Sequence, residues 1–265
     1  MKNIILIVIL FLSSCSVDRL YTSGSYGSIK TYIAKPEYRD KDTTAVYISG
    51  SFGRGEHFQS GDFSNNMSSQ NSSDDVKDDV KELFLLNIHK SFTRKNLNFY
   101  YGGGMTYGRY KFKSDFLDIV RANEKKEFYN FNTKIGVNFN LPTKRMDWRI
   151  IGLEFGYNYE FGPFQKTLQL IKNRKMSRVL VVNEKSVFSY NFNSEAVFKL
   201  KNNNVFGLGF FIGDVLNNPK ELENRSSTFS GLFFSYKFKR YIFSFIREEG
   251  RRVNSSRIGL TYQLF

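Results

Sequence analysis

The chain has little that would mark a helical membrane protein, a disulfide-stabilised domain or a disordered segment. Its 265 residues contain one cysteine and four prolines, and its mean hydropathy is −0.40. A single cysteine forms no intrachain disulfide. Helical membrane proteins need repeated apolar runs of about 20 residues, which are missing here. Aromatic residues make up 17% of the chain, which excludes wholesale disorder and favours β-strands.

The first fifteen residues have the layout of a bacterial lipoprotein signal. Met1-Lys2-Asn3 gives a short basic start, and the apolar run Ile4–Leu12 has the length of a secretory core, too short to span a bilayer. Leu12-Ser13-Ser14-Cys15 then resembles the lipobox, in which the cysteine receives diacylglycerol and becomes the mature N-terminus. We therefore predict a lipoprotein signal peptide over residues 1–14 and lipidation, palmitate included, at Cys15. The alternative is an ordinary signal peptide with an unrelated cysteine.

The charge balance is strongly basic, with 39 Lys and Arg against 25 Asp and Glu and a formal net charge of +14. The basic residues recur in short clusters, and no zinc spacing, RNP-like motif or basic helix accompanies them. Anionic lipid headgroups account for such scattered basic turns. We therefore expect outer-membrane lipids as partners and no nucleic acid.

From Thr44 onward the chain alternates apolar and polar residues, which is the pattern of a sheet with two chemically different faces. Phe128–Leu141 and Trp148–Phe161 are the clearest cases, with mainly Phe, Tyr, Ile and Leu on one face and mainly Gly, Asn and charged residues on the other. The alternation predicts about ten strands, at residues 45–56, 81–93, 97–112, 128–141, 148–161, 186–200, 205–213, 227–238, 241–247 and 256–265. Strands of this length suit a tilted bilayer crossing.

Long and short connections alternate between the predicted strands, ending with a moderate loop over residues 248–255. Short turns on one side and longer loops on the other are typical of an up-and-down transmembrane barrel. The fold prediction is therefore all-β: an antiparallel transmembrane β-barrel over residues 44–265, with about ten strands; eight or twelve are also compatible. Residues 15–43 are predicted to be an acylated periplasmic tether, and both ends of the mature chain are expected on the periplasmic side.

The polar strand face carries many Gly, Ser and Asn residues, which suit a crowded lumen, while Phe and Tyr gather near strand ends as in interfacial girdles. Together with the lipobox and the terminal Phe265, this pattern resembles the outer-membrane β-barrel lipoproteins of Bacteroidota. The resemblance covers nearly the whole mature chain and implies a location in the outer membrane of a Gram-negative cell. One departure is that Leu260 and Tyr262 do not share the parity of the final aromatic residue.

Ten strands enclose a narrow lumen that side chains of the barrel fill. Unpaired charge in such a confined site is costly, so inward-pointing charges are expected to form a network of ion pairs. The predicted members are Lys134, Glu154, Glu160, Glu195, Lys199 and Lys237. Lys134 and Glu154 are expected nearly opposite each other across one hairpin. The alternative is a conducting path lined by these charges.

No catalytic, cofactor or metal-binding residues are predicted, and the chain is not expected to be an enzyme. His57 lies near Ser51, Ser60 and Asp62 in the sequence, residue types that outer-membrane lipid hydrolases use, but no nucleophile motif accompanies them. His89 shares the parity of the lumen-facing residues, so we expect it in the periplasmic half of the lumen.

A basic, partly apolar stretch over Gln165–Lys175 is predicted to form a short amphipathic helix in an outer loop. It is the candidate for contact with a partner or with lipid headgroups. The residues predicted for this contact are Lys172, Arg174, Lys175 and Arg178.

The function expected from these patterns is that of a small, closed outer-membrane β-barrel lipoprotein with a structural or accessory, partner-binding role in the cell envelope. Any partner protein in the envelope is unknown. Two alternatives remain open at this point. One is an outer-membrane lipid-modifying hydrolase or acyltransferase, and the other is a soluble periplasmic β lipoprotein that binds a hydrophobic ligand.

Overall fold

The computed structural model describes residues 19–26, 30–58, 78–116, 118–175, 179–216, 228–250 and 253–265. Ten of the described strands form one closed antiparallel barrel, in which β12 returns to pair with β2. They are β2 (Thr43–His57), β3 (Asp79–Thr93), β4 (Leu97–Lys111), β5 (Lys125–Pro142), β6 (Met146–Phe161), β8 (Ser186–Lys199), β9 (Val205–Val215), β10 (Phe229–Phe238), β11 (Tyr241–Glu249) and β12 (Val253–Gln263). Each predicted range overlaps one of these strands, so the predicted ten-stranded antiparallel barrel is confirmed.

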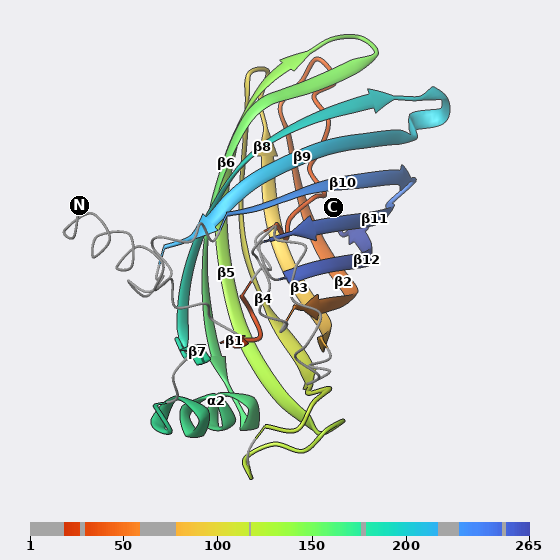
Figure 1. Cartoon of the computed structure of the whole chain (residues 1–265). Coiled ribbons are helices and arrows are strands. Elements are labelled where there is room, and N and C mark those ends of the chain that lie inside the picture. The colour runs from red at the N-terminus through yellow and green to blue at the C-terminus, as the bar shows by residue number, and fades with distance from the viewer. Residues whose placement is uncertain are drawn as a thin grey trace, which may run out of the picture.

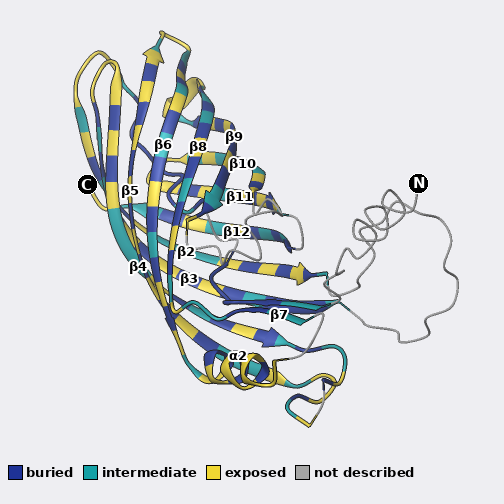
Figure 2. Ribbon diagram, turned by 60° about the vertical axis from the view of Figure 1, so that its left-hand side comes forward, coloured by how far each residue is buried: buried dark blue, intermediate teal, exposed yellow. Residues whose placement is uncertain are grey.

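The strands carry large apolar side chains on the outside of the barrel and polar side chains on the inside. In β5, Phe131 and Ile135 are 48% and 47% exposed, whereas the alternate residues Asn132 and Lys134 are each 4% exposed. Figure 2 shows the same alternation as dark blue and yellow bands along the strands. Because successive side chains of a strand point to opposite faces, the period-two pattern of the sequence becomes an apolar exterior around a polar lumen.

The two ends of the barrel differ in their connections. One end, here called the short-turn end, joins strands through residues 94–96, 143–145, 200–204 and 239–240. The other, the long-loop end, carries the connections over residues 58–78, 112–124, 162–185 and 216–228.

The predicted moderate loop over residues 248–255 is a short connection in the structure, although it lies at the long-loop end. Glu248 and Glu249 extend β11 and pair with β12, so that only residues 250–252 connect the two strands. The Gly250 amide donates to the Val253 carbonyl over 2.7 Å, which closes the hairpin tightly. Strand pairing therefore continues further toward the long-loop end than the alternation of the sequence indicated.

Three short elements cover the long-loop end: α2 (Pro163–Asn173), β7 (Val179–Val182) and β1 (Arg19–Thr22), shown in the lower part of Figure 1. Strand β1 pairs with β7 in parallel. Helix α2 begins with Pro163, whose fixed φ suits a first helical position, and it buries Phe164, Leu168 and Ile171 on one face. The predicted amphipathic helix is thus confirmed, beginning two residues earlier. No described helix is long and apolar enough to span a membrane.

The described part of residues 15–43 is not a tether outside the barrel. Residues 30–38 lie inside it, with Lys30, Tyr32 and Lys35 almost completely buried. In Figure 1 this red-to-orange segment extends from β1 toward the end at which β5 and β6 are joined. The sequence-based expectation failed because the segment has no periodicity and its buried lysines find their partners only in the folded lumen.

The described ends of the chain lie at opposite ends of the barrel. Arg19 is in β1 at the long-loop end, whereas the Phe265 carbonyl accepts a hydrogen bond from the Val46 amide near the start of β2. The expectation of a shared side was made for the mature ends, and Cys15 and the predicted signal peptide lie outside the described residues.

Candidate functional site in the barrel lumen

The described residues between Gly24 and Tyr38 are here called the N-terminal segment. Its backbone is hydrogen-bonded to a carboxylate at each end of β6. The Ser25 amide donates to Glu160 over 2.7 Å at the long-loop end. The Tyr38 amide donates to Asp147 over 2.9 Å at the short-turn end. Since Glu160 and Asp147 lie at opposite ends of one strand, the segment passes antiparallel to β6 along the length of the lumen.

A buried charge cluster holds the middle of this segment. Lys30 Nζ lies 3.1 Å from Glu154 Oε2, and Lys134 Nζ lies 3.6 Å from Glu154 Oε1. The Tyr100 hydroxyl donates to the same carboxylate over 2.8 Å. All four side chains are at least 96% buried. A buried carboxylate with two cations and a hydroxyl donor is well compensated, and removing one of its partners is correspondingly expensive.

A second buried cluster lies nearer the short-turn end. Glu195 accepts from Arg149 over 2.7 Å and pairs with Lys35 at 3.4 Å. Arg149 also donates to the carbonyl of Pro36 over 3.3 Å. The guanidinium thus joins a carboxylate of β8 to the backbone of the N-terminal segment. This contact fixes the position of the segment along the barrel axis.

The segment leaves the lumen through a third set of contacts at the short-turn end. Lys237 of β10 pairs with Glu37 at 3.1 Å. Lys199 of β8 donates to the Tyr38 carbonyl over 2.7 Å and forms an ion pair with Asp147. Ion pairs therefore fasten the segment to the wall from its centre to its exit.

All six residues of the predicted lumen network lie on the inner face of the wall and make polar contacts there. They are Lys134, Glu154, Glu160, Glu195, Lys199 and Lys237. Lys134 and Glu154 form the expected contact diagonally across the β5–β6 hairpin. The difference from the prediction is in the partners. Many of them come from the N-terminal segment, and the described partners of Glu160 are the Gly24 and Ser25 amides and Gln165 instead of a cation.

Several charged residues of the lumen were missed by the sequence analysis. They are Lys30, Lys35, Lys81, Arg149, Glu248 and Arg257. Strict alternation did not place Arg149 in the lumen, because the pairing of β6 with β8 shifts register between Arg149 and Gly152. Lys81 was not assigned to the lumen because its neighbours on the inner face are leucines. Lys30 and Lys35 lie in a stretch without any periodicity, so no signal in the sequence could have found them.

His89 lies in the short-turn half of the lumen, on the face where it was predicted. Its ring stacks between Tyr32 and Tyr47, with centroid distances of 4.6 and 4.9 Å, and Nε2 is 2.7 Å from the Ala34 carbonyl oxygen. A side chain at Gly102 would collide with His89, since its Cβ would lie 2.5 Å from the His89 Cβ. The stack therefore ties the segment to β2 and β3.

The residues considered for a hydrolase do not assemble where the structure describes them. His57 is 2% exposed and meets the ring of Tyr110 edge-on at 5.3 Å. Ser51 precedes it by six positions on the same strand, which is about 20 Å at the usual rise of a strand. Ser60 and Asp62 lie outside the described residues. His57 is thus too far from Ser51 to act as its general base.

The elements α2, β7 and β1 and the β4–β5 loop are here called the cap of the long-loop end. The cap holds the start of the N-terminal segment. Tyr21 meets Phe116 edge-on at 5.5 Å, and burial raises the pKa of Tyr21 to about 12. The Arg19 guanidinium lies 4.8 Å from the same ring and donates to the Asp115 carbonyl over 3.2 Å. These contacts hold β1 against the β4–β5 loop.

The basic residues predicted for an outer-loop contact lie at the far end of this cap. Lys172, Arg174 and Lys175 are exposed in the last turn of α2 and directly after it. Arg178 lies outside the described residues. The described members therefore form a small basic surface at the long-loop end.

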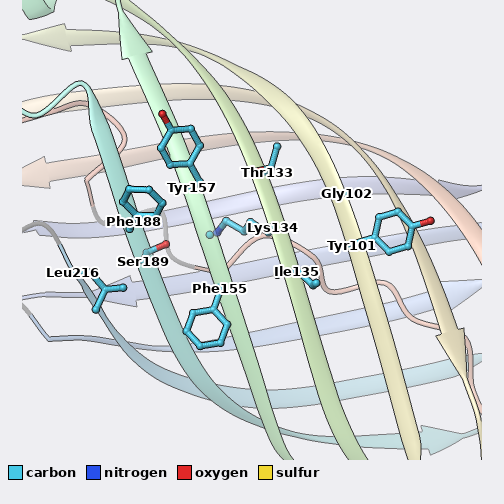
Figure 3. A pocket seen from close by; sticks show the side chains of 11 residues that line it. Tyr101, Gly102, Thr133, Lys134, Ile135, Phe155, Tyr157, Phe188, Ser189 and Leu216 are labelled. Carbon is cyan, nitrogen blue, oxygen red and sulfur yellow. The ribbon is translucent and has the colours of Figure 1, made fainter.

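A groove of about 420 Å³ lies against strands β4, β5, β6 and β8. Figure 3 shows its apolar lining, with Phe155 and Tyr157 of β6, Phe188 of β8 and Ile135 of β5. Lys134 crosses beneath Gly156, which has no side chain to block it. The lining is mainly apolar, as expected of a surface that faces hydrocarbon.

Among the residues that the structure describes, no three His, Cys, Asp or Glu side chains gather as metal ligands would. The charges of the lumen are arranged instead as ion pairs, many of them between the barrel wall and the N-terminal segment. This arrangement fastens a polypeptide in place.

No protein-family model and no curated protein matches this chain. Solved structures similar to it are outer-membrane barrels. The transport unit of the autotransporter AIDA-I from Escherichia coli is 9% identical, with a TM-score of 0.43 over 82% of this chain and 90% of that one. The β domain of the Bordetella autotransporter BrkA is 9% identical, with a TM-score of 0.42 over 83% and 98%.

The COG4313 outer-membrane channel from Pseudomonas putida F1 is also similar, at 6% identity and a TM-score of 0.37 over 87% of this chain and 97% of that one. Likenesses at this level concern the barrel fold alone. The role of this chain has to be argued from its own surface and lumen.

Proposed function

We propose that this chain is a small outer-membrane β-barrel closed by its own N-terminal segment, with a structural or accessory role in the cell envelope. The observation that carries the proposal is an apolar outer belt around a lumen that the chain itself fills. The belt supports a place in a bilayer, and the filled lumen supports a role other than diffusion of solutes.

The belt consists of large apolar side chains that point outward from neighbouring strands. Soluble monomers rarely expose a contiguous apolar patch of more than a few hundred Å², so a water-filled surrounding is unfavourable for such a surface. Members of the belt that are at least 46% exposed include Phe52, Phe84, Leu86, Ile88, Met105, Phe131, Ile135, Phe155, Phe192, Phe210, Ile212, Phe243, Ile258 and Leu260.

The edges of the belt carry the residues that suit a membrane interface. At the long-loop end, Arg109 donates to the Tyr107 hydroxyl over 2.7 Å, and that hydroxyl donates to Glu127 over 2.6 Å. At the short-turn end, the rings of Tyr241 and Tyr262 pack at 5.1 Å. Tyrosine followed by charge is the order expected where hydrocarbon gives way to headgroups and water.

The filled lumen favours a structural role over a channel or an enzyme. The two buried charge clusters around Glu154 and Glu195 occupy the space between the segment and the wall. A hydrolase is not proposed, because His57 is buried and far from Ser51. A soluble lipoprotein is not proposed either, because its aromatic faces would pack inward.

We further propose that the mature chain is acylated at Cys15, on the strength of the lipobox-like Leu12-Ser13-Ser14-Cys15. The test is metabolic labelling with an alkyne-bearing fatty acid. We expect label on the native chain and none on a Cys15→Ala variant. Equal labelling of both proteins would contradict the assignment.

The basic surface at the end of α2 is proposed to contact anionic lipid headgroups. Reversal of Lys172, Arg174 and Lys175 to glutamate tests this in two kinds of vesicle. We expect anionic lipid to raise the melting temperature of the native protein relative to zwitterionic lipid. The triple variant should lose that gain, and an undiminished gain would exclude the contact.

The decisive experiment for the barrel uses the Cys15→Ala variant, because it removes the proposed anchor. We expect this variant to stay in the outer-membrane fraction after carbonate extraction and to show heat-modifiable migration on gels. In planar bilayers it should give no steady conductance. Recovery of the variant as a soluble protein would overturn the membrane assignment.

A further inference from the structure

We infer that the chain passes outward through its own barrel, so that Arg19 lies at the cell surface, across the membrane from the C-terminus. This inference rests on the proposed function, because the membrane defines the two sides. Its structural part, the passage through the lumen, rests only on described contacts.

The contacts of the segment follow the wall in strict order. Going down β6 from the long-loop end, Glu160 meets Ser25, Glu154 meets Lys30, and Arg149 meets Pro36. Asp147, the last of them, meets Tyr38. A segment folded back on itself would break this order, so a single passage is the arrangement that fits.

The length of the segment agrees with a single passage. The part of β6 from Asp147 to Glu160 spans about 43 Å at the usual rise of about 3.3 Å per residue. The segment from Ser25 to Tyr38 has the same number of residues and covers at most about 3.3–3.6 Å for each. The two stretches thus match in length, as a single passage requires.

Both ends of the passage are fixed outside the ion pairs. At the long-loop end, β1 pairs with β7 from Arg19↔Val179 to Thr22↔Val182. At the short-turn end, the Thr93 hydroxyl donates to the Pro36 carbonyl over 2.8 Å. The segment is thus attached to the cap at one mouth and to the β3–β4 turn region at the other.

The orientation in the membrane follows from the loops. Outer-membrane barrels keep short turns on the periplasmic side and longer loops on the outer side. The long-loop end, with α2 and β1, therefore faces outward, and the Phe265 end faces the periplasm.

This path changes the side expected for the anchor. Cys15 precedes Arg19 by four residues, which reach at most about 14 Å. An acyl group on Cys15 would therefore enter the outer leaflet, whereas the sequence predicted an acylated tether on the periplasmic side. The cap would then be held close to the lipid surface by both the barrel and the anchor.

The test uses three versions of the full chain, each with one short epitope insertion. The first insertion stands directly before Arg19, and the second stands after Asp40 in the exposed turn at the short-turn end. The third stands after Lys175 and reports the side of the cap. On intact cells we expect antibody to bind the first and third insertions, and to bind the second only after permeabilisation.

A disulfide tests the attachment of β1 to β7 at the long-loop end without reference to the membrane. Leu20 and Leu180 are paired across β1 and β7, so Leu20→Cys with Leu180→Cys in the Cys15→Ala background should oxidise readily in purified protein. The matched control is Leu20→Cys with Leu170→Cys, since Leu170 lies on the exposed side of α2. We expect a disulfide in the first pair and none in the control.

The outcomes separate the inference from the proposed function. If antibody on intact cells binds the insertion after Lys175 but not the one before Arg19, the inference is overturned and the barrel assignment is unaffected. If antibody on intact cells binds only the insertion after Asp40, the barrel has the opposite orientation and the inference is overturned as well. A disulfide in a protein that is soluble without its anchor would contradict the proposed function but leave the attachment of β1 to β7 intact.

Discussion

Lys30 Nζ lies 3.1 Å from Glu154 Oε2, and both side chains are almost completely buried. The two residues are 124 positions apart in the sequence and belong to a coil segment and a barrel strand. Their pairing joins the interior segment to the wall at the middle of the lumen. The stability of the closed barrel therefore depends on charges that a hydropathy pattern treats as surface residues.

Loss of the Lys30 ammonium should destabilise the folded barrel. In Lys30→Met, Glu154 keeps Lys134 and Tyr100 but loses one of its two cations, and breaking a buried pair costs about 3–5 kcal/mol. We expect a lower urea midpoint for unfolding from lipid vesicles. Lys30→Met with Glu154→Gln should not recover the loss, because the buried Lys134 ammonium then loses the Glu154 carboxylate as well.

The matched control for this pair is Lys41→Met, since Lys41 is exposed at the short-turn end. Its urea midpoint should equal that of the native protein. Equal midpoints for Lys30→Met and Lys41→Met would contradict the importance of the buried pair.

Removal of the interior segment should open the lumen. A chain lacking residues 19–38 loses Lys30, Lys35 and Glu37, the ion-pair partners that the segment gives to Glu154, Glu195 and Lys237, and leaves their space to water. Single-channel recording in planar bilayers should then show steady conductance, while the complete chain shows none. If the deletion variant inserts correctly into the bilayer but shows no conductance, the wall side chains close the lumen without the segment.

A charge placed in the middle of the apolar belt should impair folding into lipid more than one at its edge. Ile135→Lys faces the centre of the belt, where a basic residue costs about 2–4 kcal/mol, against about 0–1 kcal/mol near the interface. Tyr129→Lys, beside Glu127 at the long-loop edge, is the control. Yields of heat-modifiable protein after refolding into vesicles should rank native, Tyr129→Lys and Ile135→Lys, and an equal yield for the two variants would argue against a bilayer around this belt.

Truncation of Phe164 should loosen the cap and leave the barrel folded. Its ring is fully buried and stacks on Tyr110 at 4.4 Å, and a buried Phe→Ala change typically costs about 3–5 kcal/mol. Limited proteolysis should therefore cut Phe164→Ala within 163–182 faster than the native protein. Leu170→Ala, which removes an exposed side chain of the same helix, should be cut at the native rate.

Much of the wall could be predicted from the sequence because its physics is local. Neighbouring side chains on a strand point to opposite faces, so a bilayer outside and a polar lumen inside would impose a period of two. This is why the parity of Phe131 and Lys134 was enough to assign them to opposite faces. The bulge near Arg149 shows the limit of the rule, because one change of register reverses the parity of the following residues.

The path of the N-terminal segment could not be predicted in this way. Lys30 and Lys35 look like residues of a solvated tether, and nothing beside them in the sequence requires otherwise. Their burial becomes favourable only when Glu154 and Glu195 from two different strands converge on them. Alternation along the chain thus specifies the barrel and its two faces, whereas the position of the segment follows from charges that closure of the barrel brings together.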